Sequence, residues 1–526
     1  MKKKILKITS TLLMGLIITF CSIFVTACEK APQNPLQNIP QNVPVVENNN
    51  FLARNKTEYK NINGKNVTVY ALYRTPWEIY NNPNVAEGIM LKQCIDYKKK
   101  YPEKDVYITL SSFHFSVVAS VCIDEKSDEY GKMKSLYDCE YDNNGYYRIS
   151  YLLVEAAKYG INVIAIGHID ASPVWNVDGS VVDDYNHTAY FESHMEDDCY
   201  IEGKKVKEYL TARTTDWTSY GDKSAADMMH LKACSVSNYI DSDGNEHSGT
   251  IWLSSTNLDG IKDFGSNGND SIQTGVVISD HDDMCRVLYN YSKLMTNYCG
   301  QEDVNYFRDI VIKRNTEQIN LINQGRENEI LKDEQIVYLG SETDKVFELY
   351  FSPFGGNVEN WDTNNNPYSK YINKLLPSIS GSDYIEFMWN NVKFVSSFGF
   401  AQTLEDIIEY SFKTNVNVKN KLYLHLGGID VSKYQELKVG KQIGFLSLNE
   451  NLNNGNHAKD LQLSYVENGE RYYVTMLTTT NFHSGAMYGQ SNSVLVIKET
   501  KQTGNNFYVE FGKLTVPGIN FDEIRI

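Results

Sequence analysis

Two stretches of this chain carry the same reactive side chains in the same order. Each has a histidine, a lysine two residues later, and then a hydroxyl residue two positions before an asparagine. These residues are His230, Lys232, Ser255 and Asn257 in the first stretch and His457, Lys459, Thr479 and Asn481 in the second. One His-x-Lys string is a weak signal, but its repetition with the same followers predicts two half-sites of one active site.

The combined inventory suits a phosphate diester. One neutral imidazole can attack phosphorus and form a covalent phosphohistidine. The other, protonated, can give its proton to the leaving alkoxide and later activate water. Lysine and asparagine side chains can stabilise charge on the non-bridging oxygens. Because the ordinary pKa of histidine is about 6.5, either ring can take either role near neutral pH. The scheme needs no metal, and no cofactor is expected.

The elements that must position these residues are themselves duplicated. In each half the sequence predicts a strand, a helix and a second strand, followed by the His-x-Lys motif. A third strand then leads to the Asn, and a fourth strand follows it. The predicted ranges are 105–115, 147–159, 161–169, 250–254 and 275–278 in the first half, and 384–394, 403–414, 421–429, 472–477 and 494–497 in the second. Strand, helix, strand units imply parallel pairing and a buried sheet. If each His-x-Lys lies on an alternating strand, its two side chains share a face. The predicted fold class is α/β, as two similar α/β/α lobes with a mixed, largely parallel sheet each.

This paired pattern resembles the phospholipase D superfamily, also called the HKD family, over about residues 70–497. The resemblance implies an active site at the interface of two duplicated lobes. It implies that His230 is the nucleophile and His457 the general acid, with Lys232 and Lys459 also catalytic. The implied contacts to the substrate phosphate come from Asn257, Asn481, Ser255 and Thr479.

The sequence departs from the family pattern at several supporting positions. The Asp usually found seven residues after the His is replaced by Ser237 and Ser464, and the Gly before the small hydroxyl residue by Ser254 and Thr478. Near the place of the acidic residue expected after each Asn stand Gln273 and Asn492, both neutral. The sequence therefore leaves open which groups orient the histidines.

The N-terminus predicts export and a lipid anchor. Four lysines at positions 2, 3, 4 and 7 precede an apolar run over 12–25, which ends in Ala27-Cys28. This resembles a bacterial lipobox, in which the signal is cut before the Cys and the Cys carries lipid. We expect a signal peptide over 1–28 with lipidation at Cys28, a flexible Pro/Asn/Gln-rich tether over 29–55, and lobes over 56–315 and 316–526. The expected location is the extracellular face of the cell membrane.

The net charge and the predicted anchor narrow the class of substrate. The net charge of −16 argues against a surface coated for nonspecific nucleic-acid binding, although it permits a local cationic pocket. An anchor at a membrane, together with the acidic surface, favours a phospholipid. An extracellular nuclease of the same superfamily is the first alternative, because the superfamily contains exonucleases that tolerate changes at the motif Asp.

A second alternative is a non-catalytic surface binding protein on a decayed enzyme fold. Loss of the orienting acids favours it, and retention of all six central His, Lys and Asn residues opposes it. The predicted partners are a phosphodiester substrate and, through the anchor, the membrane. No protein partner is predicted.

Overall fold

The structure is a computed structural model of the chain. It describes residues 51–74, 81–168, 174–175, 181–182, 187–217, 228–258, 272–355, 366–368, 370–371, 386–390, 421–426, 443–447, 457–480, 489–515, 522 and 525–526. All of them belong to one unit, Asn48–Ile526. The predicted signal, Cys28, Asn481 and the predicted helix over 403–414 lie outside the described residues.

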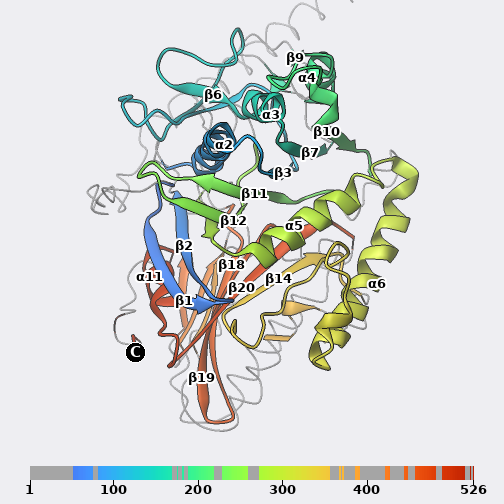
Figure 1. Ribbon diagram of the computed structural model, residues 1–526. Coiled ribbons are helices and arrows are strands. Elements are labelled where there is room, and N and C mark those ends of the chain that lie inside the picture. Colours follow the sequence, from blue (N-terminus) through green and yellow to red (C-terminus); the bar gives the residue numbers. More distant parts are fainter. Residues whose placement is uncertain are drawn as a thin grey trace, which may run out of the picture. The chain divides into compact units, whose positions relative to one another are not determined.

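The first half builds an eight-stranded sheet in the order β1-β2-β13-β12-β11-β3-β7-β10 (Figure 1). Its strands are β1 (Asn55–Ile62), β2 (Lys65–Arg74), β3 (Tyr107–Ser112), β7 (Asn162–His168), β10 (Leu210–Thr215), β11 (Lys232–Ile240), β12 (Glu246–Ser254) and β13 (Gln273–Ser279). Strands β3, β7 and β10 are parallel, and β11, β12, β13, β2 and β1 continue the sheet with antiparallel pairs.

The second half repeats this arrangement in a seven-stranded sheet, β14-β20-β19-β18-β15-β16-β17. Its strands are β14 (Phe347–Ser352), β15 (Glu386–Asn390), β16 (Lys421–Leu426), β17 (Ile443–Ser447), β18 (Asp460–Glu467), β19 (Glu470–Thr478) and β20 (Asn492–Thr500). Again three strands, β15, β16 and β17, are parallel and the other four pair antiparallel. The two sheets match strand for strand except for the extra β1. This confirms the predicted duplicated α/β fold. The expectation that each sheet is largely parallel was wrong, because antiparallel pairs outnumber parallel ones in both sheets.

Of the two helices predicted from the sequence, the one over 147–159 falls within the described residues, and a helix forms there. Helix α3 (Ile149–Lys158) lies inside the predicted range and ends before Gly160, whose φ of 78° is a backbone conformation that glycine adopts readily. Helix α2 (Pro83–Lys100) begins at the N-cap Asn82, whose side chain accepts the backbone N–H of Asn84. Helix α5 (Asp282–Met295) follows β13 directly.

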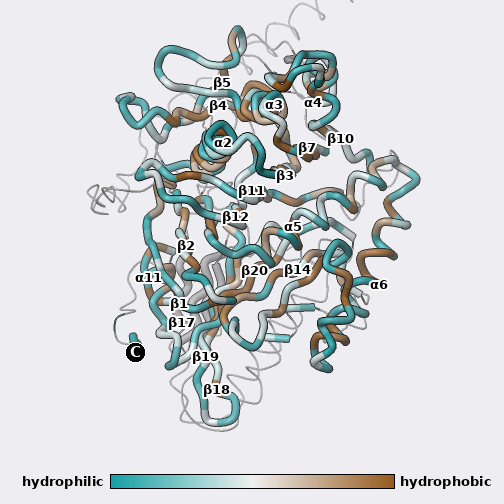
Figure 2. Tube along the Cα trace, viewed as in Figure 1, coloured by the Kyte–Doolittle hydropathy of each residue, from teal (hydrophilic) through white to brown (hydrophobic). Residues whose placement is uncertain are grey.

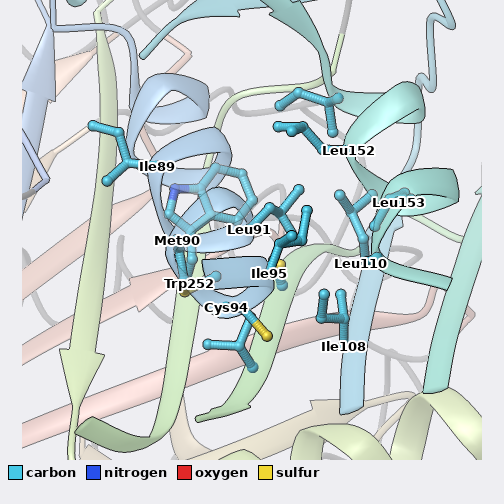
Figure 3. Packing of buried hydrophobic residues seen from close by; sticks show 14 of the residues in the cluster. Ile89, Met90, Leu91, Cys94, Ile95, Ile108, Leu110, Leu152, Leu153 and Trp252 are labelled. Atoms are coloured by element: carbon cyan, nitrogen blue, oxygen red, sulfur yellow. The ribbon is translucent and has the colours of Figure 1, made fainter. Parts of the chain in front are cut away.

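Helices cover both faces of the first sheet. Helix α2 packs against β11 on one face, and α5 packs against β12 and β11 on the other (Figure 1). On the α2 face, Met90, Leu153 and Trp252 belong to one cluster of buried hydrophobic side chains (Figure 3). The indole N–H of Trp252 also donates to the carbonyl of Pro83 at 2.8 Å.

The core on the α5 face continues into the second half. It includes Val276 and Ile278 of β13 together with Leu495 and Ile497 of β20. The two sheets therefore share one hydrophobic cluster rather than meeting only at a polar surface.

Two predicted boundaries can be compared with the described chain. Phe51 is fully buried and packs edge-on against Tyr70 and Tyr239, so the folded part begins before residue 55, where the tether was predicted to end. The predicted lobe boundary at 315/316 falls within α6 (Val304–Asn323), an amphipathic helix along which hydrophobic and hydrophilic residues alternate (Figure 2). The division into lobes at that position stays a prediction.

Two further features bear on the sequence predictions. The seven cysteines from Cys94 to Cys299 are all free thiols. In the part of the chain that the structure describes, no helix combines the length and apolarity needed to span a membrane.

Candidate active site

The two histidines lie just before the strands that the sequence assigned to them. Strand β11 begins at Lys232 and β18 begins at Asp460, so His230 and His457 are outside the regular pairing of their own sheets. The expectation that each His and Lys share one alternating strand was therefore wrong for both histidines and for Lys459.

The physical reason is that each histidine's backbone pairs with the other half. The N–H of His230 donates to the carbonyl of Ser491 at 2.9 Å, next to a bridge between Met229 and Ser491. The N–H of His457 donates to the carbonyl of Ile272 at 3.0 Å. These reciprocal bonds place both His-x-Lys segments at the junction of the two halves, where the resemblance implied the site.

The imidazole of His230 is held in one tautomer. Its Nδ1 lies 2.8 Å from the carbonyl oxygen of Thr479 and 3.0 Å from Oδ1 of Asn492. Because both neighbours accept hydrogen bonds, the proton of the neutral ring belongs on Nδ1. The lone pair then lies on Nε2, which receives a hydrogen bond from Nζ of Lys232 at 3.3 Å. Nε2 is thus the atom available for attack on phosphorus.

The imidazole of His457 is oriented in the same way by the first half. Its Nδ1 lies 3.2 Å from Oε1 of Gln273. Each histidine is therefore oriented by a neutral amide from the opposite half, Gln273 or Asn492. Sequence reasoning placed these two residues near the expected acidic position but did not identify them as orienting groups. The available signal was their equivalent place in the two halves, each at the first residue of the strand that follows the Asn.

The small hydroxyl residues contact these amides. Ser255 Oγ donates to Oε1 of Gln273 at 2.6 Å, and Thr479 Oγ1 donates to Oδ1 of Asn492 at 3.3 Å. Each hydroxyl also accepts a backbone N–H from the neighbouring strand, at 3.1 Å in the first half and 3.0 Å in the second. In the structure, each hydroxyl therefore donates a hydrogen bond to the amide that orients a histidine. The expected contact of these hydroxyls with the substrate phosphate stays a prediction.

Two ammonium groups are buried at this junction. Lys232 is 0% and Lys459 is 2% exposed, and each Nζ donates to the carbonyl of the histidine two residues earlier, at 3.1 and 2.8 Å. Burial first, and then the charges of Lys232 and Lys459, hold the pKa of His230 well below its ordinary value. His230 is consequently neutral at physiological pH. It is buried, whereas His457 is half-buried.

The other positions that the sequence singled out are Asn257, which is expected to bind phosphate, and the two serines at the usual places of the motif Asp. Asn257 is buried, and its Oδ1 has no hydrogen-bond partner among the described residues, which leaves a polar atom available for a ligand. At the usual positions of the motif Asp, Ser237 accepts the backbone N–H of Tyr107 at 3.0 Å and Ser464 accepts Nη1 of Arg471 at 3.1 Å. These serines contact neighbouring strands rather than the histidines. No set of three or more His, Cys, Asp or Glu side chains in the described part is arranged to hold a metal ion.

Comparison with family models and with curated proteins finds no match. Solved structures with a similar chain trace include phosphatidylserine synthase of Haemophilus influenzae, at 10% identity and a TM-score of 0.42, covering 85% of this chain and 86% of that one. Yeast tyrosyl-DNA phosphodiesterase matches at 9% identity and a TM-score of 0.33, covering 81% and 90%. Polyphosphate kinase of Porphyromonas gingivalis matches at 11% identity and a TM-score of 0.39, covering 81% of this chain. This chain spans 47% of that kinase. No residue role follows from likenesses of this strength.

Proposed function

We propose that this protein is a phosphodiester hydrolase of the phospholipase D superfamily that works through a phosphohistidine. The observation that carries the proposal is the state of His230. Its Nδ1 donates to two acceptors, its Nε2 carries the lone pair, and buried ammonium groups lie beside it. A neutral imidazole next to two cations is suited to attack an anionic phosphate.

In the first step, Nε2 of His230 forms a bond to phosphorus while the bond from phosphorus to the leaving oxygen breaks. That oxygen takes a proton from His457, and the alcohol departs. In the second step, the now neutral His457 takes a proton from water, whose oxygen attacks phosphorus and releases His230. Lys232 and Lys459 would contact the non-bridging oxygens, with Asn257 and Asn481 as amide donors. The greater exposure of His457 suits a group that must meet both an alcohol and water.

The substrate we propose is a phospholipid. The support comes from the predicted lipid anchor at Cys28, which would place the enzyme on the extracellular face of a membrane, and from the net charge of −16, which disfavours long polyanions. A nucleic acid is the competing substrate, and it is tested in the same experiment.

The test offers the purified full chain three substrates with and without EDTA: phosphatidylcholine vesicles, single-stranded DNA and bis(p-nitrophenyl) phosphate. We expect cleavage that survives EDTA and disappears in His230→Ala. With a p-nitrophenyl leaving group, which departs without a proton, His457→Ala should accumulate a phosphorylated chain and His230→Ala should not. Loss of activity in EDTA would contradict the metal-free scheme. Failure to cleave all three diesters would favour the binding-protein alternative.

A further inference from the structure

One aromatic ring of the first half touches both reactive groups of the first half-site. Phe113 follows the last residue of β3 and is only half-buried. Its ring centroid lies 5.1 Å from that of His230, with the planes inclined by 50°. Nζ of Lys232 lies over the same ring at 5.4 Å from the centroid, within the range of a cation–π interaction.

The ring of Phe113 is itself supported from behind. It stacks on His168 with a centroid distance of 5.3 Å and an angle of 24°. The hydroxyl of Thr215 donates to the carbonyl of Gly167 at 3.2 Å, so its oxygen accepts from Nδ1 of His168 at 2.9 Å. Burial holds the pKa of His168 down at about 3, so this supporting ring is uncharged. Phe113, His168 and Thr215 come from the carboxyl ends of the parallel strands β3, β7 and β10 and form a fixed, neutral wall.

The sequence of the second half differs at the position equivalent to Phe113. Register pairs Lys232 with Ser112 in the first sheet and Asp460 with Asn390 in the second. Extending both registers by sequence makes Val392, which is aliphatic and lies outside the described residues, the counterpart of Phe113. By sequence, the two half-sites therefore differ at this position. Among the described residues, the aromatic contact is found at the half-site whose histidine is buried.

We propose that Phe113 is a positioning residue that makes the two duplicated histidines unequal, holding His230 as the nucleophile. This inference rests on the proposed function. The titratable and charged groups that face His230 are Lys232, Lys459 and His457, and His114 and His168 face Phe113. Asn492 and Thr479 fix His230 from the second half, and Phe113 closes the first-half side. The ring excludes water from His230 and confines its Nε2 and the ammonium of Lys232 to one arrangement.

The experiment compares Phe113→Leu and Phe113→Tyr with a matched control, Phe115→Leu, in the full chain. Phe115 is fully buried in the same loop, but its ring stacks on His187 and packs edge-on against Phe191 instead of contacting His230. Imidazole NMR titration should show the pKa of His230 rising toward the ordinary value of about 6.5 in Phe113→Leu, because water gains access. In Phe113→Tyr and in Phe115→Leu the pKa of His230 should stay low. For bis(p-nitrophenyl) phosphate, kcat/KM of Phe113→Leu should fall about tenfold to a hundredfold, which is the loss expected when a reacting group is misplaced by about 1 Å. The acid limb of its pH profile should also move to higher pH.

The possible outcomes separate the inference from the function it rests on. An unchanged His230 titration in Phe113→Leu overturns the inference, whether or not any diester is cleaved. Equal effects of Phe113→Leu and Phe115→Leu overturn it as well, because they indicate general loosening of the loop. If the wild-type chain cleaves no diester while the titration moves as expected, the proposed function fails and the positioning contact stands.

Discussion

Nδ1 of His230 lies 3.0 Å from Oδ1 of Asn492, although the two residues belong to opposite halves of the molecule. A carboxylate at this place would fix the same tautomer and would also favour the charged imidazolium. The amide fixes the tautomer without adding charge. In a site that already holds two buried ammonium groups, an amide keeps the ring of His230 neutral. An amide at the place where the family resemblance leads us to expect an acid is thus compatible with the proposed catalysis.

Asn492→Asp should move the acid limb of the kcat/KM profile to higher pH. The carboxylate favours protonated His230 and so raises its pKa from the depressed value of the wild type. Attack requires the unprotonated ring, so activity is lost at a higher pH as the solution is acidified. The pH dependence of kcat/KM for bis(p-nitrophenyl) phosphate measures this limb, which reports on the free enzyme.

Gln273→Glu serves as the internal counterpart, because Gln273 contacts His457 and not His230. Its carboxylate favours the protonated form of His457, the form that acts as acid. For a short-chain phospholipid, whose leaving alkoxide needs the proton of His457, the basic limb of the kcat/KM profile should move to higher pH while the acid limb stays in place. An acid-limb shift in both variants, or in neither, would show that the two amides do not act on separate histidines.

Removal of the small hydroxyls should lower kcat more than it raises KM. In Ser255→Ala and Thr479→Val the amide oxygen loses the hydroxyl that holds it. The histidine it orients becomes less well placed, and we expect kcat to fall about tenfold with KM changed by less than about twofold. Steady-state kinetics on a short-chain phospholipid makes the comparison. A rise in KM at constant kcat would instead support direct phosphate contact, as the family resemblance implies.

The duplicated fold was accessible from the sequence because its signals are local. Apolar alternation and helical spacing located β7 and α3 to within a few residues, and Gly160 marked the end of α3. The repeated His-x-Lys spacing then indicated that the two halves act together. These features depend on neighbours in the chain, which a sequence displays directly.

The orienting contacts were not accessible, because they join residues about 180 to 260 positions apart. No local sequence pattern indicates that Gln273 orients the histidine of the other half. Phe113 was overlooked for a related reason. A single aromatic residue after a strand is usually packing, and only the fold brings it against His230 and Lys232.

Lys232→Met should abolish most activity without weakening the fold. Removing one preorganised hydrogen-bond donor that stabilises charge in the transition state costs about a hundredfold to a thousandfold in kcat, and we expect a loss of that order here. A fully buried ammonium carries a desolvation cost, so an apolar side chain of similar length should leave the melting temperature equal or higher.

Tungstate or inorganic phosphate tests the same site without turnover. Either anion should raise the melting temperature of the wild type, because it binds only the native state, and should do so less in Lys232→Met. Lys60→Met, at an exposed lysine of β1, should respond like the wild type. An equal anion response in Lys232→Met would place the phosphate site elsewhere.

Glu87 gives the fold a pH dependence independent of the active site. This carboxyl lies buried in α2, accepts Nδ2 of Asn84 at 3.0 Å, and has its pKa raised by burial from 4.5 to about 8. Between these two values the native chain binds a proton that the unfolded chain has lost, so stability falls as pH rises through this window. Glu87→Gln keeps a neutral hydrogen-bonding group at every pH. It should match the wild type near pH 5 and exceed it by a few kcal/mol, at roughly 1.4 kcal/mol per pKa unit, near pH 8.5. Urea unfolding at the two pH values, with exposed Glu103→Gln as control, measures the difference. Parallel changes in Glu87→Gln and the wild type would show that Glu87 does not titrate in this range.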